Sequence, residues 1–299
     1  MASWQAHLLS GLCKFTIKRP LRKSPTVATI RRVFAAAKLK VPRGCNVQDA
    51  TIGGVRGEWM TAPGVPQVGT MLYLHGGAYI ACSPVSHRPL IAAFARQGWR
   101  VFAPDYRLAP EHPFPAAIDD AVAAYRGLVA SIDPKQLVVA GDSAGGNLTL
   151  ALCLSLRTAG VPQPAALALF SPVTDFTWSG SSIRANSERC AMFTHEVLPM
   201  GTAFYLNGHN PRDPLASPLF APIHDLHNLP PMLFHASSDE ILCDDSVRMA
   251  ERVRAAGLEV EIATWPVVPH VWQLLHDLIP EGRESLRLTG SFLLRHVNP

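Results

Sequence analysis

The sequence has few charged residues and no long apolar run. Charged residues make up 17% of the 299 positions, and hydrophobic residues make up 48%. No stretch approaches the roughly 20 consecutive apolar residues that a membrane helix needs. The short apolar stretch 8–12 has no basic region before it, so we expect no secretory signal. These absences argue against a membrane span and favour a cytoplasmic protein with a large buried core.

Cysteines are also sparse and scattered. None of the six forms a C-x-x-C pair, and no metal-ligand spacing is present. We therefore expect them to be small buried residues in a reducing compartment, and we expect neither a metal nor another cofactor. The six are Cys13, Cys45, Cys82, Cys153, Cys190 and Cys243.

The net charge of +4 is small for this length, but basic residues gather near the N-terminus. Such a cluster can suit nucleic acid or an anionic membrane. No nucleic-acid motif accompanies it, so we favour the solvated face of helices and expect no nucleic-acid partner. The cluster comprises Lys14, Lys18, Arg19, Arg22, Lys23, Arg31, Arg32, Lys38 and Lys40.

The most informative stretch is Gly-Asp-Ser-Ala-Gly at 141–145. It follows the apolar run 137–140 and precedes a helix-forming run over 144–158. A Gly-x-Ser-x-Gly pentapeptide between a strand and a helix is the context of a nucleophile elbow. We therefore predict Ser143 as the nucleophile. The amide of Ala144 would lie at the helix N-terminus, which favours negative charge.

Further elements follow other predicted strands. The apolar run 70–74 leads into His75-Gly76-Gly77-Ala78, a loop that suits an oxyanion hole. We expect the hole to be formed by the N–H groups of Gly76, Gly77 and Ala144. Glycines there let the backbone approach the substrate oxygen.

The acid and the base come later in the chain. The apolar run 232–236 ends before Asp239 and Glu240, and we favour Asp239 because the first position past the strand points most directly at the histidine loop. Asp244 and Asp245 better suit the N-terminus of the following helix. Among 12 histidines, His270 follows a predicted strand at 260–264 by a short loop. Serine, acid and histidine then have the chain order of an α/β-hydrolase triad.

Strands and helices alternate along most of the chain. We predict a hairpin over 46–61, and the alternation indicates a parallel sheet covered by helices on both faces. The predicted strands are 71–75, 101–103, 137–140, 165–170, 232–236 and 260–263; the predicted helices are 86–97, 116–130, 144–158, 244–256 and 285–295. The alternation breaks between about 175 and 229, where Pro, Ser and Asn are frequent and one helical piece falls near 195–206.

These motifs resemble those of the hormone-sensitive-lipase-like carboxylesterases, also called bacterial esterase family IV, of the α/β-hydrolase superfamily. The resemblance covers roughly residues 45 to 295. It depends on the His-Gly-Gly loop at 75–77, the block Asp-Tyr-Arg-Leu-Ala-Pro-Glu at 105–111, and the motifs at 141–145, 238–242 and 270–272. Ala78 departs from relatives that carry a third glycine. The resemblance implies an α/β-hydrolase fold: a mostly parallel eight-stranded sheet flanked by helices, with a helical cap.

The same resemblance implies an organisation and an activity. We expect N-terminal cap helices over 1–45, a catalytic domain over 46–174 and 213–299, and a cap insertion over 175–212. The expected activity is hydrolysis of short-chain acyl esters through an acyl-enzyme, with a small-molecule ester as the partner. An acyltransferase stays open, as does a homodimer, whereas a non-catalytic binding protein is disfavoured because Ser143, Asp239 and His270 are all present.

Four residues are further candidates for substrate binding. They are Tyr79, Leu242, Val271 and Trp272, which flank the expected site in the chain. Aromatic side chains beside a sheet more often belong to the core.

Overall fold

The computed structural model describes residues 2–34 and 40–297, so that Lys38 of the basic cluster lies outside the described residues. Its centre is one eight-stranded sheet with the order β1-β2-β4-β3-β5-β6-β7-β8. β1 and β2 pair antiparallel, as do β2 and β4, and all other pairs are parallel. The strands are β1 Asn46–Ile52, β2 Val55–Thr61, β3 Gly69–Leu74, β4 Trp99–Pro104, β5 Leu137–Asp142, β6 Leu167–Phe170, β7 Met232–Ser237 and β8 Val260–Trp265.

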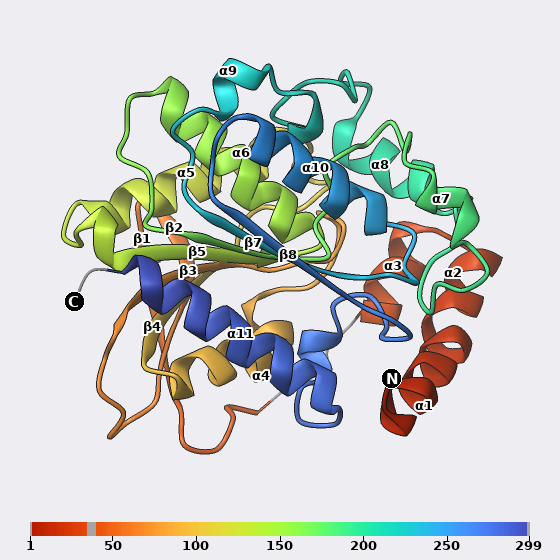
Figure 1. The fold of residues 1–299 in the computed structure, drawn as a ribbon, viewed down its shortest axis with the longest axis horizontal. Coiled ribbons are helices and arrows are strands. Elements are labelled where there is room, and N and C mark those ends of the chain that lie inside the picture. Colours follow the sequence, from red (N-terminus) through yellow and green to blue (C-terminus); the bar gives the residue numbers. More distant parts are fainter. Residues whose placement is uncertain (1, 35–39, 298–299) are drawn as a thin grey trace.

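Helices cover both faces of the sheet (Figure 1). One face carries α5 Ala116–Val129, α6 Ala144–Thr158 and α10 Cys243–Ala255, and the other carries α4 Pro84–Arg96 and α11 Pro280–His296. Each face has its own apolar core. Because strands β3, β5, β6 and β7 are buried along their whole length, they read as continuous apolar runs.

The expected fold class is confirmed, and most element boundaries fall within two residues of the prediction. The largest difference is α11, which begins at Pro280 rather than at residue 285. Proline suits the first turn of a helix, since its missing N–H group would have no partner there. The antiparallel hairpin β1–β2 turns at Gly53 and Gly54, which both have positive φ.

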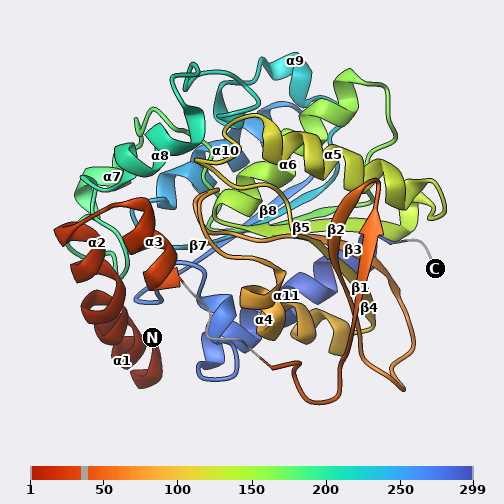
Figure 2. The ribbon, with the colours of Figure 1, turned by 180° about the vertical axis from the view of Figure 1, so that it is seen from behind.

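Two groups of helices outside the sheet lie at the same end of the molecule. The N-terminal group is α1 Trp4–Cys13, a π-helical turn Lys14–Lys18, α2 Arg19–Lys23 and α3 Val27–Phe34. The second group, α7 Ser182–Ala185 and α8 Leu198–Leu206, lies in the insertion between β6 and β7. Figure 2 shows both groups beside each other from the opposite side. The remaining short elements are η2 Pro134–Gln136, η3 Pro218–Phe220, α9 Ile223–Leu226 and η4 Trp272–Leu275.

No helix in residues 2–34 and 40–297 combines the length and the apolar character that crossing a membrane requires.

Two basic side chains fasten the N-terminal group to the rest of the protein. The buried ammonium group of Lys18 donates to the carbonyl oxygens of Ser187, Glu188 and Cys190, at 2.7, 3.1 and 3.0 Å. Burial lowers the pKa of Lys18. Arg31 of α3 donates to the carbonyl oxygen of Ile80 and forms a two-bond ion pair with Glu111. The N-terminal helices are therefore held to the insertion and to the loop after β3.

A buried carboxyl group ties α10 to the start of the insertion. One oxygen of Asp245 accepts the N–H groups of Thr174 and Asp175 at 2.6 and 3.0 Å. The other oxygen has no hydrogen-bond partner among the described residues. Burial raises the pKa of Asp245 to about 7, although the N–H group of Thr174 acts in the opposite direction. The native protein therefore holds a proton here that the unfolded chain releases near its ordinary pKa of 3.8.

Asp245→Asn is expected to flatten the pH dependence of stability. Because the folded pKa lies above the unfolded one, this group destabilises the native state progressively as pH rises from about 4 to about 7. Between these pH values, the free energy of unfolding of Asp245→Asn should rise relative to that of wild type by an amount on the order of 4 kcal/mol. Urea unfolding at a series of pH values from 4 to 8 measures the difference. Asp277→Asn is the exposed control, and an equal gain in that variant would contradict the assignment.

Candidate active site

Ser143 lies at a sharp turn between β5 and α6. Its backbone has φ 53° and ψ −119°, a strained conformation that residues with side chains rarely adopt. Only glycine fits on either side: a Cβ atom on Gly145 would lie 1.9 Å from the carbonyl oxygen of Leu74, and one on Gly141 would lie 2.3 Å from that of Gly145. The N–H group of Ser143 donates to Phe170 of β6 at 2.8 Å, which fixes the turn to the neighbouring strand.

Ser143 lines a small cavity of about 90 Å³ with mostly apolar walls. The N-terminal segment and the insertion supply most of these walls, so segments outside the sheet shape the cavity. Its lining residues are Leu21, Pro25, Ile30 and Phe34 from the N-terminal segment; Phe176, Trp178, Phe193, Val197, Leu198, Gly201 and Thr202 from the insertion; and Ala78, Ser143, Ala144, Val173 and Leu242.

His270 is buried beside this cavity and is paired with Glu240. Its Nδ1 atom lies 2.5 Å from Oε2 of Glu240, and both side chains are almost fully buried. The other ring nitrogen, Nε2, has no partner among the described residues. The ring packs against Phe193, a cavity residue, with centroids 5.2 Å apart. The expected contact between Asp239 and His270 is therefore wrong, because Glu240 makes it.

The turn after β7 explains this correction. The N–H group of Glu240 donates back to the carbonyl oxygen of Ser237, so the chain reverses within four residues. Oε1 of Glu240 accepts the Ser237 N–H group and the Ser171 hydroxyl, each at 2.8 Å, which leaves Oε2 for His270. The carboxylate of Asp239 instead accepts the N–H group of Val267 at 3.2 Å. The sequence carried no signal for this choice, since both side chains follow the same strand.

The loop after β3 leaves only one of its two predicted N–H donors without an acceptor. The N–H group of Gly76 donates to Oδ1 of Asp142 at 3.0 Å, so it is already paired within the protein. The N–H groups of Gly77, Ala78 and Ala144 have no backbone or side-chain acceptor among the described residues. Gly77 has φ +116° and Ala78 has φ 57°, a turn that continues into the cavity wall at Ala78. Of the three predicted donors, Gly76 is therefore already paired within the protein, whereas Gly77 and Ala144 are not.

Asp142 anchors this loop to the elbow. Besides the Gly76 N–H group, it accepts the hydroxyl of Tyr73 at 2.7 Å, and His87 Nε2 lies 3.2 Å from its Oδ1. Burial raises the pKa of Asp142, but attraction to His87 and the hydrogen bonds from His87 and Tyr73 outweigh it, and the net direction is downward. Burial lowers the pKa of His75 to about 3, so its imidazole is neutral where it stacks on Tyr106. Neither histidine lines the cavity.

Of the four candidate substrate-binding residues, Leu242 alone lines the cavity. Tyr79 is buried in the core, where its ring stacks on Tyr205 at 3.7 Å and its hydroxyl donates to Asn147. Val271 is buried with φ 51° and turns the chain after His270. Trp272 packs with Ala6 and donates to the carbonyl oxygen of Glu281. The aromatic candidates therefore belong to the core.

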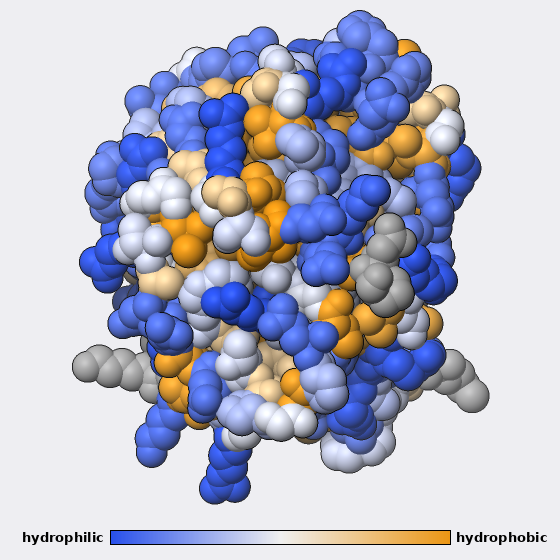
Figure 3. All heavy atoms as spheres, turned by 90° about the vertical axis from the view of Figure 1, so that its left-hand side faces the viewer, coloured by the Kyte–Doolittle hydropathy of each residue, from blue (hydrophilic) through white to orange (hydrophobic). Residues whose placement is uncertain are grey.

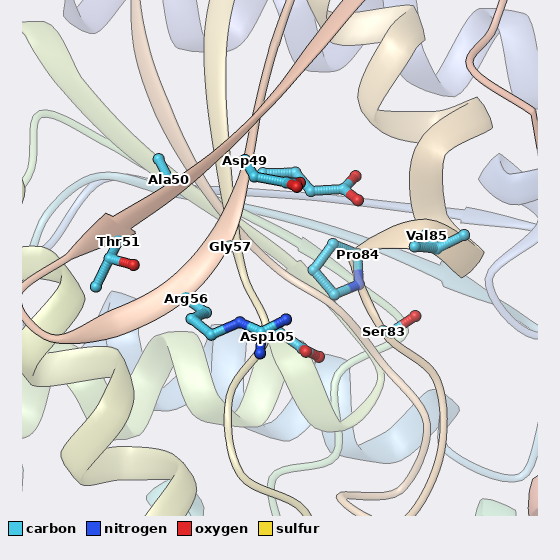
Figure 4. Close-up of a pocket in the computed structure, with 10 residues that line it drawn as sticks. Asp49, Ala50, Thr51, Arg56, Gly57, Ser83, Pro84, Val85 and Asp105 are labelled. Atoms are coloured by element: carbon cyan, nitrogen blue, oxygen red, sulfur yellow. The ribbon is translucent and has the colours of Figure 1, made fainter.

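A larger hollow lies elsewhere, between the β1–β2 hairpin and the start of α4. It measures about 650 Å³ and is lined by Asp49, Ala50, Thr51, Arg56, Gly57, Glu58, Ser83, Pro84, Val85 and Asp105. Figure 4 shows the side chains of Arg56 and Asp105 among those that line it. Neither Ser143 nor His270 lines this hollow, so it is separate from the paired histidine and the elbow.

Comparison with known proteins agrees with this geometry. A family model described as alpha/beta hydrolase fold matches residues 71–274. The chain is 40% identical to an acetyl-hydrolase of Streptomyces hygroscopicus, over 89% of this chain and 88% of that protein. It is 35% identical to an esterase of Acinetobacter venetianus, over 97% of this chain and 96% of that one.

A solved structure of a bacterial esterase extends the likeness to the whole fold. The crystal structure of an esterase from the bacterial hormone-sensitive lipase family superposes with a TM-score of 0.91. The two chains are 36% identical, and the alignment covers 100% of each. The chain therefore belongs to the hormone-sensitive-lipase-like carboxylesterases of the α/β-hydrolase fold and is a carboxylic ester hydrolase.

Proposed function

We propose that this protein hydrolyses short-chain acyl esters through a Ser143–His270–Glu240 triad and an acyl-enzyme. The observation that carries the proposal is the state of His270. One ring nitrogen is bound to a buried carboxylate at 2.5 Å, and the other has no partner among the described residues. A base oriented by a third group is what a serine nucleophile requires, because its hydroxyl is weak at its own pKa.

In the first half of the reaction, Ser143 Oγ attacks the ester carbonyl while His270 Nε2 takes its proton. Glu240 fixes the imidazole tautomer and stabilises the imidazolium without becoming protonated. The imidazolium then protonates the leaving alcohol, and the acyl group stays on Ser143.

The tetrahedral oxyanion is bound by the N–H groups of Gly77, Ala78 and Ala144. Their lack of other acceptors supports this role, and Ala144 stands at the N-terminus of α6, where the helix dipole favours negative charge. One such donor typically contributes about 3 kcal/mol to lowering the barrier.

In the second half, water attacks the acyl-enzyme and His270 accepts its proton. The same donors bind the second oxyanion. His270 returns the proton to Ser143 as the carboxylic acid leaves, so the enzyme is regenerated.

The short acyl preference rests on the cavity. The cavity has a volume of about 90 Å³, and Phe34, Trp178 and Phe193 are among the residues that line it. The likeness to a protein named acetyl-hydrolase also supports a small acyl group. We assign the walls to a cap made of residues 1–45 and 175–212, over a catalytic domain of 46–174 and 213–299. All six cysteines are free, which supports a reducing, cytoplasmic location.

Rates on p-nitrophenyl esters are expected to peak at acyl chains of about four to six carbons and to fall beyond about ten. Each methylene that fits gains roughly 0.8 kcal/mol of burial, whereas carbons beyond the filled cavity gain nothing. The measurement is kcat/KM across esters from acetyl to palmitoyl.

Phe34→Ala should move the optimum to longer chains, since it removes one wall of the cavity. Leu294→Ala, which truncates an exposed residue of α11, is the control and should keep the wild-type profile. A wild-type profile that rises through palmitoyl esters would contradict the short-chain assignment. Transfer of most acyl groups to an added alcohol in preference to water would indicate an acyltransferase.

A further inference from the structure

Helix α1 and the π-helical turn after it pack against the protein mainly with small residues and turn four large apolar residues outward. Ala6, Ser10 and Cys13 are buried. Trp4, Leu8, Leu12 and Phe15 are exposed by 71, 63, 54 and 65%. Spacings of four, four and three residues place these four along one side of α1 and of the π-helical turn that continues it. We call them the α1 apolar row.

The inner face of α1 is firmly attached, so the orientation of the row is fixed. The backbone N–H group and the hydroxyl of Ser3 donate to Glu281 at 2.6 and 2.9 Å. Ser10 donates to the carbonyl oxygen of Val267, and Ala6 packs with Trp272. The helix cannot bury the row by rolling inward without breaking these contacts.

A run of positive charge continues from the row. Arg19 and Arg22 follow Phe15 at the same spacing of four and three residues, and the Arg19 guanidinium lies 5.3 Å from the centre of the Phe15 ring. Lys14 and Lys23 are exposed beside them. The first 48 residues hold ten Lys and Arg and no Asp or Glu, whereas residues 49–299 hold 17 Lys and Arg against 23 Asp and Glu. The row is therefore set in the one strongly basic part of the chain.

We propose that the α1 apolar row and the adjacent basic residues dock the protein on the surface of an anionic lipid bilayer. An exposed Trp, Phe and Leu face flanked by Lys and Arg is the composition of a helix that lies in the membrane interface. Trp in particular prefers the level of the lipid headgroups. Each nearby Lys or Arg adds attraction to an anionic leaflet.

The charge pattern disfavours a second copy of the chain and nucleic acid as partners of the α1 apolar row. A two-fold dimer on this face would set two basic segments against each other. Nucleic acid would use the positive charge but would leave the apolar row in water. On the side of the molecule away from α1, apolar residues occur as separate patches among hydrophilic ones (Figure 3).

Vesicle co-sedimentation of the full-length protein tests the proposal. The wild type should bind phosphatidylglycerol vesicles at low salt, bind phosphatidylcholine vesicles much more weakly, and be released by salt. Arg19→Gln/Arg22→Gln should weaken binding to the anionic vesicles by about 25-fold, at roughly fivefold for each charge. Leu8→Gln/Leu12→Gln should weaken it at least about tenfold.

Matched controls distinguish binding through the α1 apolar row from non-specific binding through other exposed residues. Ile223→Gln/Leu294→Gln changes two exposed apolar residues far from α1, and Arg254→Gln/Arg287→Gln removes two exposed charges on other helices. Both should bind as wild type does. Hydrolysis of a water-soluble ester without vesicles should be unchanged in all four variants, which verifies their folding.

Three results would overturn the proposal. The first is wild type that stays in the supernatant with anionic vesicles at low salt. The second is a control pair that loses as much binding as its test pair. The third is another occupant of the face: a dimer that Leu8→Gln/Leu12→Gln dissociates, or DNA bound as tightly as the vesicles. Because binding is read without substrate, failure here is distinguishable from failure of the proposed triad.

Discussion

Glu240→Gln is expected to lower kcat by about 10⁴-fold, as loss of the orienting carboxylate does in other triads. The hydrogen bonds of Glu240 dictate how the glutamine would sit. Oε1 accepts from Ser171 and Ser237, so the glutamine oxygen takes that place and its NH₂ group faces His270. An NH₂ group facing Nδ1 favours the tautomer with the proton on Nε2, which cannot act as the base.

Asp239→Asn is the matched comparison, one residue away on the same turn. Asparagine keeps an oxygen that can accept from Val267, so kcat should stay within about threefold of wild type. Steady-state kinetics on a short p-nitrophenyl ester measures both variants. Full activity in Glu240→Gln together with loss in Asp239→Asn would return the acid to position 239.

Ser143→Ala is expected to reduce kcat by about 10⁶-fold, because triad members act as a unit and the covalent step disappears. The fold should persist, since the change removes one oxygen atom and leaves the glycines that permit the turn. KM should change little, because nearly all of the cavity wall comes from other residues.

Two measurements check this expectation. Pre-steady-state kinetics with excess ester should show no burst of alcohol release in the variant. A fluorophosphonate should label wild type on the peptide that contains Ser143. Ser155→Ala, on the same helix and bonded within it, is the control and should react normally. A label on any other residue would mean that the elbow serine is not the nucleophile.

The sheet could be predicted well because its signals are local. The buried strands are continuous apolar runs. The glycines on either side of Ser143 indicate a turn in which neighbouring backbone comes too close for a Cβ atom. The helix boundaries that differ from the prediction, such as the start of α11 at Pro280, depend on which backbone N–H and C=O groups at the helix end the tertiary structure leaves unpaired. Sequence patterns describe that poorly.

The site was harder to predict where it depends on side chains from several strands. The sequence favours Asp239 over Glu240 because the donors that orient Glu240, Ser171 and His270, come from other segments of the chain. The sequence does not reveal that the Asp142 side chain accepts the Gly76 N–H group, because that contact joins two segments far apart in the chain. Tyr79 and Trp272 were expected near substrate from their chain positions, but their hydrogen bonds lie within the core.

The residues that line the cavity and the residues that would carry out the reaction come largely from different parts of the chain. Leu21, Pro25, Ile30 and Phe34 line the same cavity as Ser143, yet they come from a stretch that adds no strand to the sheet. That stretch is joined to the rest through a few side chains such as Lys18 and Arg31. Substrate range can therefore drift in evolution, or be exchanged by grafting one N-terminal segment for another, while the bond-breaking machinery is inherited intact.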